Sequence, residues 1–209
     1  MAFDELRQDY DGAPLVEGLC ESDPRTQFGG WFDAAVATGM DMPNAMTLAT
    51  VGKDGVPQAR IVLLKELDSE GFVFFTNYES NKGQELAANN RASLMFWWRE
   101  LARQVRIVGE VHKVTAEVSD AYFATRPRES NLAAMASDQS RTLESRDVLE
   151  RRMRTLDSGD ELVRPACWGG YRLVPQSFEF WQGRPDRAHD RLEYRLDESG
   201  SWAIRRLYP

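Results

Sequence analysis

The sequence has few of the residues that most often build metal centres and nucleophilic sites: two cysteines and two histidines among 209 residues. Cys20 and Cys167 stand far apart and form no CxxC pair, so nothing supports a disulfide and a metal site is not expected. The histidines, His112 and His189, leave little material for a His-based catalytic triad. Chemistry that relies on these residue types is therefore disfavoured.

Long apolar runs are also missing. None approaches the roughly 18–20 residues that span a membrane, and the charged start does not resemble a signal peptide. We expect a cytoplasmic protein without a membrane partner. The net charge of −7 argues against nucleic acid, whose binding depends on Lys and Arg neutralising phosphates. A few basic side chains in one cleft can still bind a small phosphorylated ligand.

Common catalytic and cofactor motifs are absent too: no GxGxxG, P-loop, HExxH or GxSxG occurs. What is present is ordinary for a globular protein, with 42% hydrophobic and 28% charged residues. A chain of this length can bury about 70% of its unfolded surface in one core. Residues 1–20 are polar and broken by Gly12-Ala13-Pro14, so we expect a mobile arm there and a single domain over 21–209.

Periodicity of the apolar residues predicts an α+β fold, an antiparallel β-barrel with flanking helices. Helices are expected at 3–10, 23–38, 81–90, 116–125, 129–137 and 144–156. Strands are expected at 45–51, 59–67, 71–76, 92–98, 104–114, 170–174, 177–182, 192–196 and 202–207. Asp54-Gly55 and Gly200 predict the first and last hairpin turns.

Two basic residues stand inside an apolar strand, Arg60 and Lys65. Their odd spacing would direct them to opposite faces of a regular strand. One interpretation is that Arg60 pairs with an acid and Lys65 ends the strand in solvent. The other is that each binds a phosphate, because a buried charge is costly unless it is paired.

Other candidates are weak when taken singly. Lys82 follows Ser80-Asn81 at an expected helix start, where free N–H groups can bind phosphate or the serine can simply cap the helix. Polar groups also occur in loops, and each of these has an ordinary solvated interpretation: Arg126, Arg128, Ser130, Gln139 and Ser140. Trp181 is followed closely by Arg187, His189, Asp190 and Arg191, a set that suits a flat anionic aromatic ligand or an ordinary charged hairpin loop.

Taken in order, these segments resemble the pyridoxine/pyridoxamine 5'-phosphate oxidase family. The resemblance covers nearly the whole chain, from Leu6-Arg7 to Pro209. The stretches that carry it are RIVLLK (60–65), RQV (103–105), YFATRPRES (122–130), SDQS (137–140), WGGYR (168–172), EFWQG (179–183) and RAHDR (187–191). The chain departs from the family at Asn81, where an arginine is common, and at Ala188, where a larger apolar residue is common.

The resemblance implies an FMN-binding split barrel that forms a homodimer, with two FMN sites at the subunit interface. The FMN phosphate would be bound by Arg60, Lys82, Gln139 and Ser140, and Phe75 and Thr76 would lie along the flavin. Gln104, Trp181 and Arg191 would contact the isoalloxazine ring. Further cofactor contacts are expected at Ile61, Val62, Leu63, Lys65 and Asn81.

For the substrate, the resemblance implies a phosphate site made of Lys65, Tyr122, Arg126 and Ser130. Arg187 and His189 would act beside the pyridine ring, and Arg7 and Tyr10 would belong to a segment that closes over the site. The implied reaction oxidises pyridoxamine or pyridoxine 5'-phosphate to pyridoxal 5'-phosphate and reduces O2 to H2O2. Two alternatives stay open: an FMN oxidase of phenazine type, and a binding protein without turnover.

Overall fold

The computed structural model describes residues 9–209, without the side chain of Asp186. The strands are β1 (Ala45–Val51), β2 (Pro57–Leu63), β3 (Glu66–Leu67), β4 (Phe72–Asn77), β5 (Arg91–Trp98), β6 (Arg103–Lys113), β7 (Trp168–Gln182), β8 (Asp190–Leu196) and β9 (Trp202–Leu207). The helices are α1 (Pro24–Ala37), α2 (Asn81–Ala88), α3 (Ala116–Thr125), α4 (Arg128–Ala136) and α5 (Arg146–Leu156), with short 3-10 turns η2 (Glu17–Leu19), η3 (Arg99–Leu101) and η4 (Pro185–Arg187).

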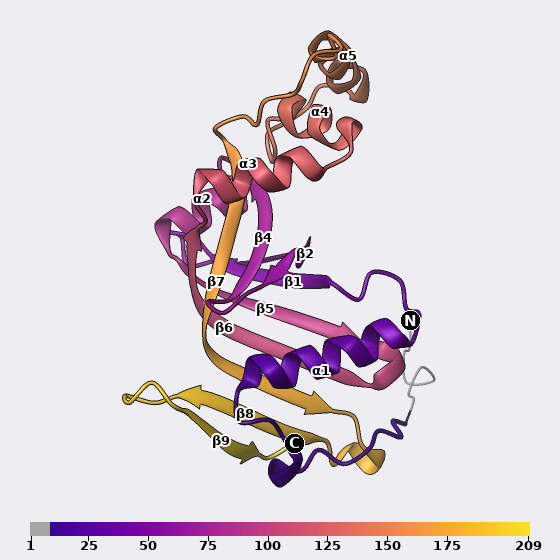
Figure 1. Ribbon diagram of the computed structural model, residues 1–209, viewed down its shortest axis with the longest axis vertical. Coiled ribbons are helices and arrows are strands. Elements are labelled where there is room, and N and C mark those ends of the chain that lie inside the picture. The colour runs from indigo at the N-terminus through magenta and orange to yellow at the C-terminus, as the bar shows by residue number, and fades with distance from the viewer. Residues whose placement is uncertain (1–8) are drawn as a thin grey trace.

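The strands form one curled antiparallel sheet in the order β2-β1-β5-β6-β7-β4-β3, and the hairpin of β8 and β9 continues from β7. Helix α1 packs on one side of this sheet, while α3, α4 and α5 stand together at its far end (Figure 1). The expected α+β split barrel with flanking helices is confirmed. No helix in the described part of the chain has the length and apolarity to cross a membrane.

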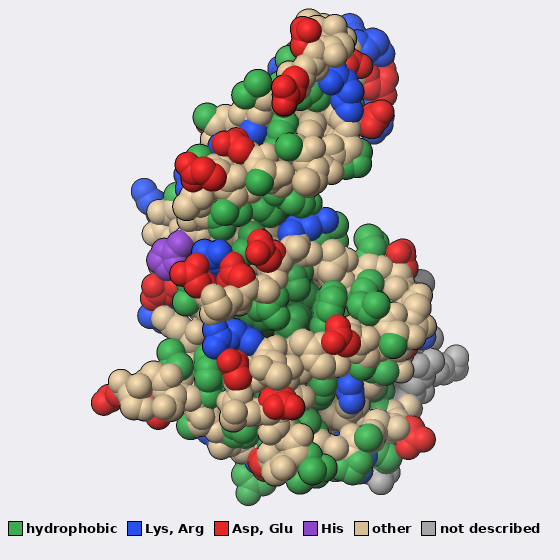
Figure 2. Space-filling view, in the orientation of Figure 1, with side chains coloured by type: hydrophobic (Ala, Val, Ile, Leu, Met, Phe, Trp, Pro, Cys, Tyr) green, Lys and Arg blue, Asp and Glu red, His purple; other side chains and the backbone are tan. Residues whose placement is uncertain are grey.

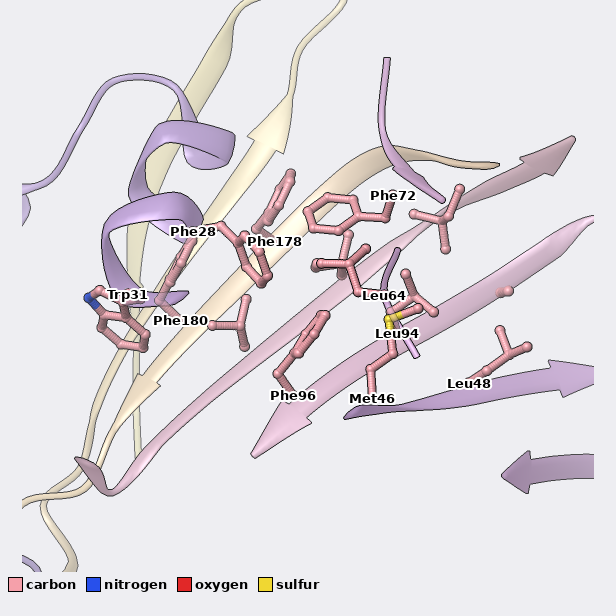
Figure 3. Packing of buried hydrophobic residues seen from close by; sticks show 14 of the residues in the cluster. Phe28, Trp31, Met46, Leu48, Leu64, Phe72, Leu94, Phe96, Phe178 and Phe180 are labelled. Carbon is pink, nitrogen blue, oxygen red and sulfur yellow. The ribbon is translucent and has the colours of Figure 1, made fainter. Parts of the chain in front are cut away.

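The core lies between α1 and the sheet (Figure 3). Helix α1 begins as expected, because the Asp23 side chain accepts a hydrogen bond from the Arg25 amide at 2.8 Å and Pro24 occupies the first turn. Phe28 then inserts between Phe72 and Phe96, with ring centroids 5.0 and 4.9 Å away. This packing anchors the helix on the strands.

One expected strand proved to be two. The run at 59–67 ends as β2 at Leu63, and the chain then changes partners: the Leu64 amide donates to the Asn44 carbonyl, whereas the Lys65 amide donates to the Val73 carbonyl, both at 2.9 Å. Arg60 therefore lies beside β1, and Lys65 lies beside β4. The prediction that these two side chains face opposite sides of one strand was wrong, because the strand does not continue between them.

Two expected strands, 170–174 and 177–182, proved to be one continuous strand, β7. The register against β6 shifts between Val108 and Gly109, which pair with Ser177 and Pro175 and leave Gln176 as the extra residue. Proline is tolerated in a strand at such a bulge. The first half of β7 pairs with β4 and the second half with β8, so β7 connects the helical end of the molecule to the C-terminal hairpin.

The remaining helices and strands appear within about two residues of their expected bounds. The helix expected at 3–10 falls mainly outside the described residues. The described part of the expected arm, 9–20, lies against the domain, and Leu15 is buried in the core cluster. The arm's mobility stays a prediction.

Candidate functional site

A cavity of about 850 Å³ lies between the sheet and the helices α3 and α4. In the space-filling view the helical part stands over the sheet, and Lys and Arg side chains lie near the junction (Figure 2). Twelve of the residues predicted from the sequence line this cavity: Arg60, Ile61, Val62, Leu63, Lys65, Phe75, Thr76, Lys82, Tyr122, Arg126, Ser130 and Gln139. They come from β2, β4, α2, α3, α4 and the connecting loops, so only the fold brings them together.

Lys82 is the half-buried cation at one side of the cavity. Its Nζ lies 2.8 Å from Gln139 Oε1 and 3.5 Å from Ser80 Oγ, both neutral oxygens. Burial, and then the nearby positive charge of Arg60, lower the pKa of Lys82. Among the described residues no carboxylate lies within ion-pair distance of this ammonium. A phosphate placed here would supply the missing counter-charge.

The first interpretation of Arg60, pairing with an acid, is confirmed, whereas phosphate binding stays a prediction. Its Nη2 lies 2.8 Å from Glu85 Oε2, so it pairs with an acid, and it also lines the cavity. Thr50 shares the carboxylate by donating to Glu85 Oε2 at 2.5 Å, and Arg60 Nη1 contacts the Thr50 hydroxyl. The guanidinium is thereby held in place before any ligand binds.

Three stacked aromatic rings form the wall of the cavity. Phe75 lies 4.0 Å from Tyr122 and 5.6 Å from Trp168, centroid to centroid, with nearly parallel planes. Gly170 makes this arrangement fit, because a Cβ there would meet Phe75 Cε1 at 2.8 Å and Val114 Cγ2 at 2.6 Å. The wall suits a flat ligand edge and excludes water from one side of the cavity.

The second cationic side of the cavity is made by Arg126 and Lys65. The Arg126 guanidinium lies over the Trp168 ring at 4.5 Å and donates to Asn131 Oδ1 and the Ser130 carbonyl, at 3.1 and 3.2 Å. Burial lowers the pKa of Arg126. Lys65 Nζ lies 5.8 Å from the centre of the Tyr122 ring. The cavity thus presents two basic sites, one around Lys82 and one around Arg126.

Other predicted residues form a separate group around the C-terminal hairpin. We call Tyr10, Trp181 and His189, together with Trp97, which the sequence analysis did not predict, the hairpin cluster. Trp181 is its centre, with ring centroids 5.6 Å from Tyr10, 5.9 Å from Trp97 and 4.6 Å from His189. None of the four lines the cavity.

Gln104 and Arg191 flank this cluster, because both pair with Trp181 in the sheet, on β6 and β8. Arg191 Nε lies 2.9 Å from Glu179 Oε1. Burial by itself would raise the pKa of Glu179, but hydrogen bonds and charge from Arg191 and Arg106 outweigh it and lower that pKa. Arg191 is therefore held in place by the carboxylate of Glu179 on the neighbouring strand β7.

Arg187 is exposed and has a φ of 59° in the left-handed region. A non-glycine residue there costs roughly 1–2 kcal/mol. Such strain persists where the surrounding structure enforces it and is common at functional sites. The neighbouring His189 accepts a hydrogen bond at Nδ1 from the Arg184 amide at 3.1 Å, so in the neutral ring Nε2 carries the hydrogen.

The pKa of His189 is lowered, first by burial and then by the charge of Arg187. Arg187→Ala removes a repulsion that acts only on the protonated ring, so we expect the His189 pKa to rise toward its ordinary value of 6.5. Titration of the imidazole resonances by NMR measures this, with His112 in β6 as the internal control. A pKa that stays the same or falls in the variant contradicts the electrostatic contact.

The two groups of residues lie at opposite ends of β7. Phe75 pairs with Gly170 and Gln104 pairs with Trp181, and these positions are separated by about 36 Å of strand at 3.3 Å per residue. Within one chain, Lys65 and Arg187 therefore do not share a cavity. A single site that uses both groups needs two chains.

Two predicted residues do not line this cavity, and a third lies outside the described part of the chain. Asn81 is the exposed first residue of α2 and does not line the cavity. Ser140 lies in a neighbouring hollow of about 280 Å³ that shares Gln139 with the cavity. Arg7 lies outside the described residues. Their roles stay predictions.

The sequence analysis missed Trp168, although it belongs to the Trp-Gly-Gly-Tyr-Arg stretch that carries the resemblance. A tryptophan directly before two glycines was the available signal, since glycines permit close approach of a ring. Asn77 and Pro127 also line the cavity, without a signal of their own. In the described part of the chain, no group of three or more His, Cys, Asp and Glu could hold a metal ion.

Comparison with known proteins gives consistent matches. Residues 32–158 match the family described as pyridoxamine 5'-phosphate oxidase, and residues 168–209 match the pyridoxine 5'-phosphate oxidase C-terminal dimerisation region. A pyridoxine/pyridoxamine 5'-phosphate oxidase of Cupriavidus pinatubonensis is 56% identical over 98% of both chains. One from Microcystis aeruginosa is 53% identical over 98% of this chain and 97% of its own.

Among solved structures, PhzG from Burkholderia lata, in complex with tetrahydrophenazine-1-carboxylic acid, is similar to this fold with a TM-score of 0.90. The two chains are 31% identical, and the match covers 95% of this chain and 100% of PhzG.

Proposed function

The chain belongs to the pyridoxamine 5'-phosphate oxidase family, and from this premise we propose that it oxidises pyridoxamine 5'-phosphate and pyridoxine 5'-phosphate to pyridoxal 5'-phosphate. FMN is the proposed cofactor, and O2 is the proposed oxidant, reduced to H2O2. The observation that carries the proposal is a single cavity with two separate basic sites, around Lys82 and around Arg126. Two sites suit two phosphorylated ligands, a cofactor and a substrate.

The site around Lys82 fits the cofactor phosphate. The ammonium there hydrogen-bonds only to neutral oxygens among the described residues. Burial, and then the charge of Arg60, lower its pKa and outweigh the opposing effect of Glu85. Arg60 is held beside it by Glu85. Bound FMN supplies the chemistry that the protein side chains lack, by accepting a hydride and passing its electrons to O2.

The site around Arg126 fits the substrate phosphate. Lys65, Tyr122, Arg126 and Ser130 all line the cavity, which gives two cations and two hydroxyl groups. Binding a phosphate remote from the reacting carbon supplies energy that aligns this carbon with the cofactor. Arg187 and His189 would orient the pyridine ring and balance its charge, with His189 neutral near pH 7 because its pKa is lowered.

We propose that the protein acts as a homodimer and that each site combines the cavity of one chain with the hairpin cluster of the other. Two features support this: the separation of the two groups along β7, and the match of residues 168–209 to a dimerisation region. A twofold symmetric dimer repeats the same contact twice and so builds two equivalent sites. Gln104, Trp181 and Arg191 would then reach the flavin of the partner's cavity.

A phenazine-type oxidase is the second candidate, favoured by the similarity to PhzG. The ligand named with that structure is a carboxylic acid without a phosphate. The four residues of the proposed substrate-phosphate site favour a phosphorylated substrate, and the curated relatives with 53–56% identity are more similar than PhzG with 31%.

The absorbance spectrum of the purified protein tests the proposal. We expect a flavin band that is bleached when pyridoxamine 5'-phosphate is added without oxygen, and peroxide release when air is admitted. Pyridoxamine without its phosphate is the control and should bleach the band far more slowly. A flavin band that the phosphorylated compound does not bleach would contradict the assigned substrate, and the absence of any flavin would contradict the oxidase function.

A further inference from the structure

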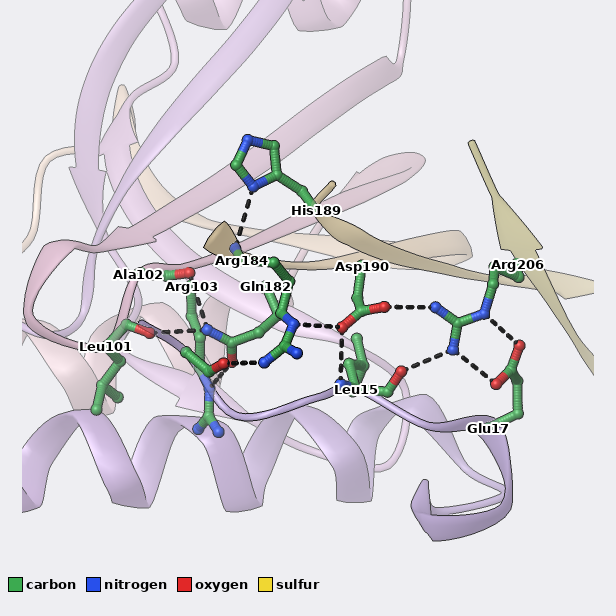
Figure 4. Close-up of polar contacts among 11 residues, drawn as sticks. Leu15, Glu17, Leu101, Ala102, Arg103, Gln182, Arg184, His189, Asp190 and Arg206 are labelled. Carbon is green, nitrogen blue, oxygen red and sulfur yellow. Dashed lines mark hydrogen bonds and ion pairs between the residues drawn. The ribbon is translucent and has the colours of Figure 1, made fainter. Parts of the chain in front are cut away.

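A segment of residues 9–19, which we call the strap, lies across the C-terminal hairpin (Figure 4). We propose that Arg206 and Asp190 are positioning residues that clamp the strap and thereby hold Tyr10 against Trp181 and His189, on the face where substrate binds. The inference rests on the proposed function for its kinetic consequence, whereas the clamp itself rests on contacts in the structure.

Arg206 makes the largest set of contacts in the clamp. Its Nε and Nη2 bind the two carboxylate oxygens of Glu17 at 2.8 and 2.7 Å, and Nη2 also donates to the Leu15 carbonyl at 2.7 Å. Its Nη1 lies 2.6 Å from Asp190 Oδ1. One guanidinium from β9 therefore binds two residues of the strap and one residue of β8.

Asp190 completes the clamp from the other side. Its Oδ2 accepts a hydrogen bond from the Leu15 amide at 3.1 Å and lies 3.5 Å from Arg184 Nε. Arg184 in turn contacts the carbonyl of Gly12 through Nη1, while its own amide donates to His189 Nδ1. The same side chains that hold the strap thus also adjoin the imidazole.

The strap packs closely against the end of β7 because two glycines at the contact have no side chain. Gly12 belongs to the strap, and Gly183 faces it. A Cβ on Gly12 would meet Gln182 Nε2 at 2.1 Å, and one on Gly183 would meet Tyr10 Cγ at 2.7 Å. Tyr10 then lies edge-on to Trp181 and His189, with centroids 5.6 and 5.7 Å away. Arg206 and Asp190 hold residues 15 and 17, and Arg184, which Asp190 adjoins, holds residue 12. Loss of the clamp would therefore loosen the end of the strap that carries Tyr10.

Arg206→Gln in the FMN-loaded enzyme tests the clamp, with Arg205→Gln as the matched control. Arg205 is the adjacent residue of β9 and pairs with Glu193 instead of the strap. We expect amide hydrogen exchange in residues 9–19 to be at least about threefold faster in Arg206→Gln and unchanged in Arg205→Gln. Equal exchange in wild type and Arg206→Gln would overturn the clamp, whatever reaction the enzyme catalyses.

The kinetic part is tested by combining Arg206→Gln with Tyr10→Ala. We expect Arg206→Gln to raise the KM for pyridoxamine 5'-phosphate about fivefold while kcat changes less than about twofold. In the Tyr10→Ala background the same substitution should leave KM unchanged, because the clamp acts through Tyr10. A fivefold rise that persists without Tyr10 would overturn the positioning role. A wild-type enzyme that does not turn over this substrate would instead refute the proposed function, and the exchange comparison would still decide on the clamp.

Discussion

We expect mixing Lys65→Met with Arg187→Ala to restore about a quarter of the wild-type activity, although each variant alone should retain only about 1% of kcat/KM. Lys65 lines the cavity. Arg187 ends the 3-10 turn η4, between Trp181 and His189 of the hairpin cluster, at the other end of β7. If each site uses the cavity of one chain and the hairpin of its partner, a mixed dimer contains one site with both defects and one site with none. Random reassociation makes roughly half of the dimers mixed, so about a quarter of all sites are intact.

The measurement is the activity of the two variants after joint unfolding and refolding, or after co-expression with two different affinity tags. A mixture of Arg187→Ala with His189→Ala is the matched control, because both residues come from the hairpin and every mixed site then keeps one defect. No recovery in the Lys65→Met and Arg187→Ala mixture would show that both residues act within one chain, and the proposed dimeric site would be wrong.

We expect Arg187→Ala by itself to lower kcat by about 100-fold, the usual cost of losing a charged group that acts at the reacting centre. The affinity for FMN should change less than about twofold, because the proposed site for the FMN phosphate around Lys82 lies in the cavity and not beside Arg187. Arg187 is exposed and has a left-handed φ, so its truncation removes no buried packing.

Steady-state turnover and fluorescence titration of the apoprotein with FMN measure the two quantities separately. Arg195→Ala is the control: this exposed arginine lies on β8 and pairs with Glu193, away from the hairpin cluster. Equal losses of turnover and of FMN affinity in Arg187→Ala would contradict its assignment to the reaction.

The local elements of the fold were predictable because the signals for them are local. Asp23 and Pro24 begin α1, and Ser80 caps α2 by accepting a hydrogen bond from the Gly83 amide. Gly55 and Gly200 have positive φ in the first and last hairpin turns, as their sequence positions predicted. In β1 the apolar Met46 and Leu48 are buried on one face, as the period of two in a strand predicts.

The strand boundaries that the sequence analysis missed depend on pairing between distant residues. Nothing near Leu64 shows that its amide bonds to Asn44 while the next amide bonds to Val73. Likewise a proline such as Pro175 predicts the end of a strand, yet the register shift against β6 accommodates it. Trp168 was missed because its stacking partners, Phe75 and Tyr122, come from other elements.

The sequence by itself determined the kinds of elements, the basic side chains and the family resemblance, since caps, periodicity and motifs are properties of neighbouring residues. Only the tertiary structure decided that Arg60 and Lys65 face one cavity and that Arg187 lies far from it along β7. The physical reason is that antiparallel pairing joins residues far apart in the chain, and that pairing alone sets which side chains meet.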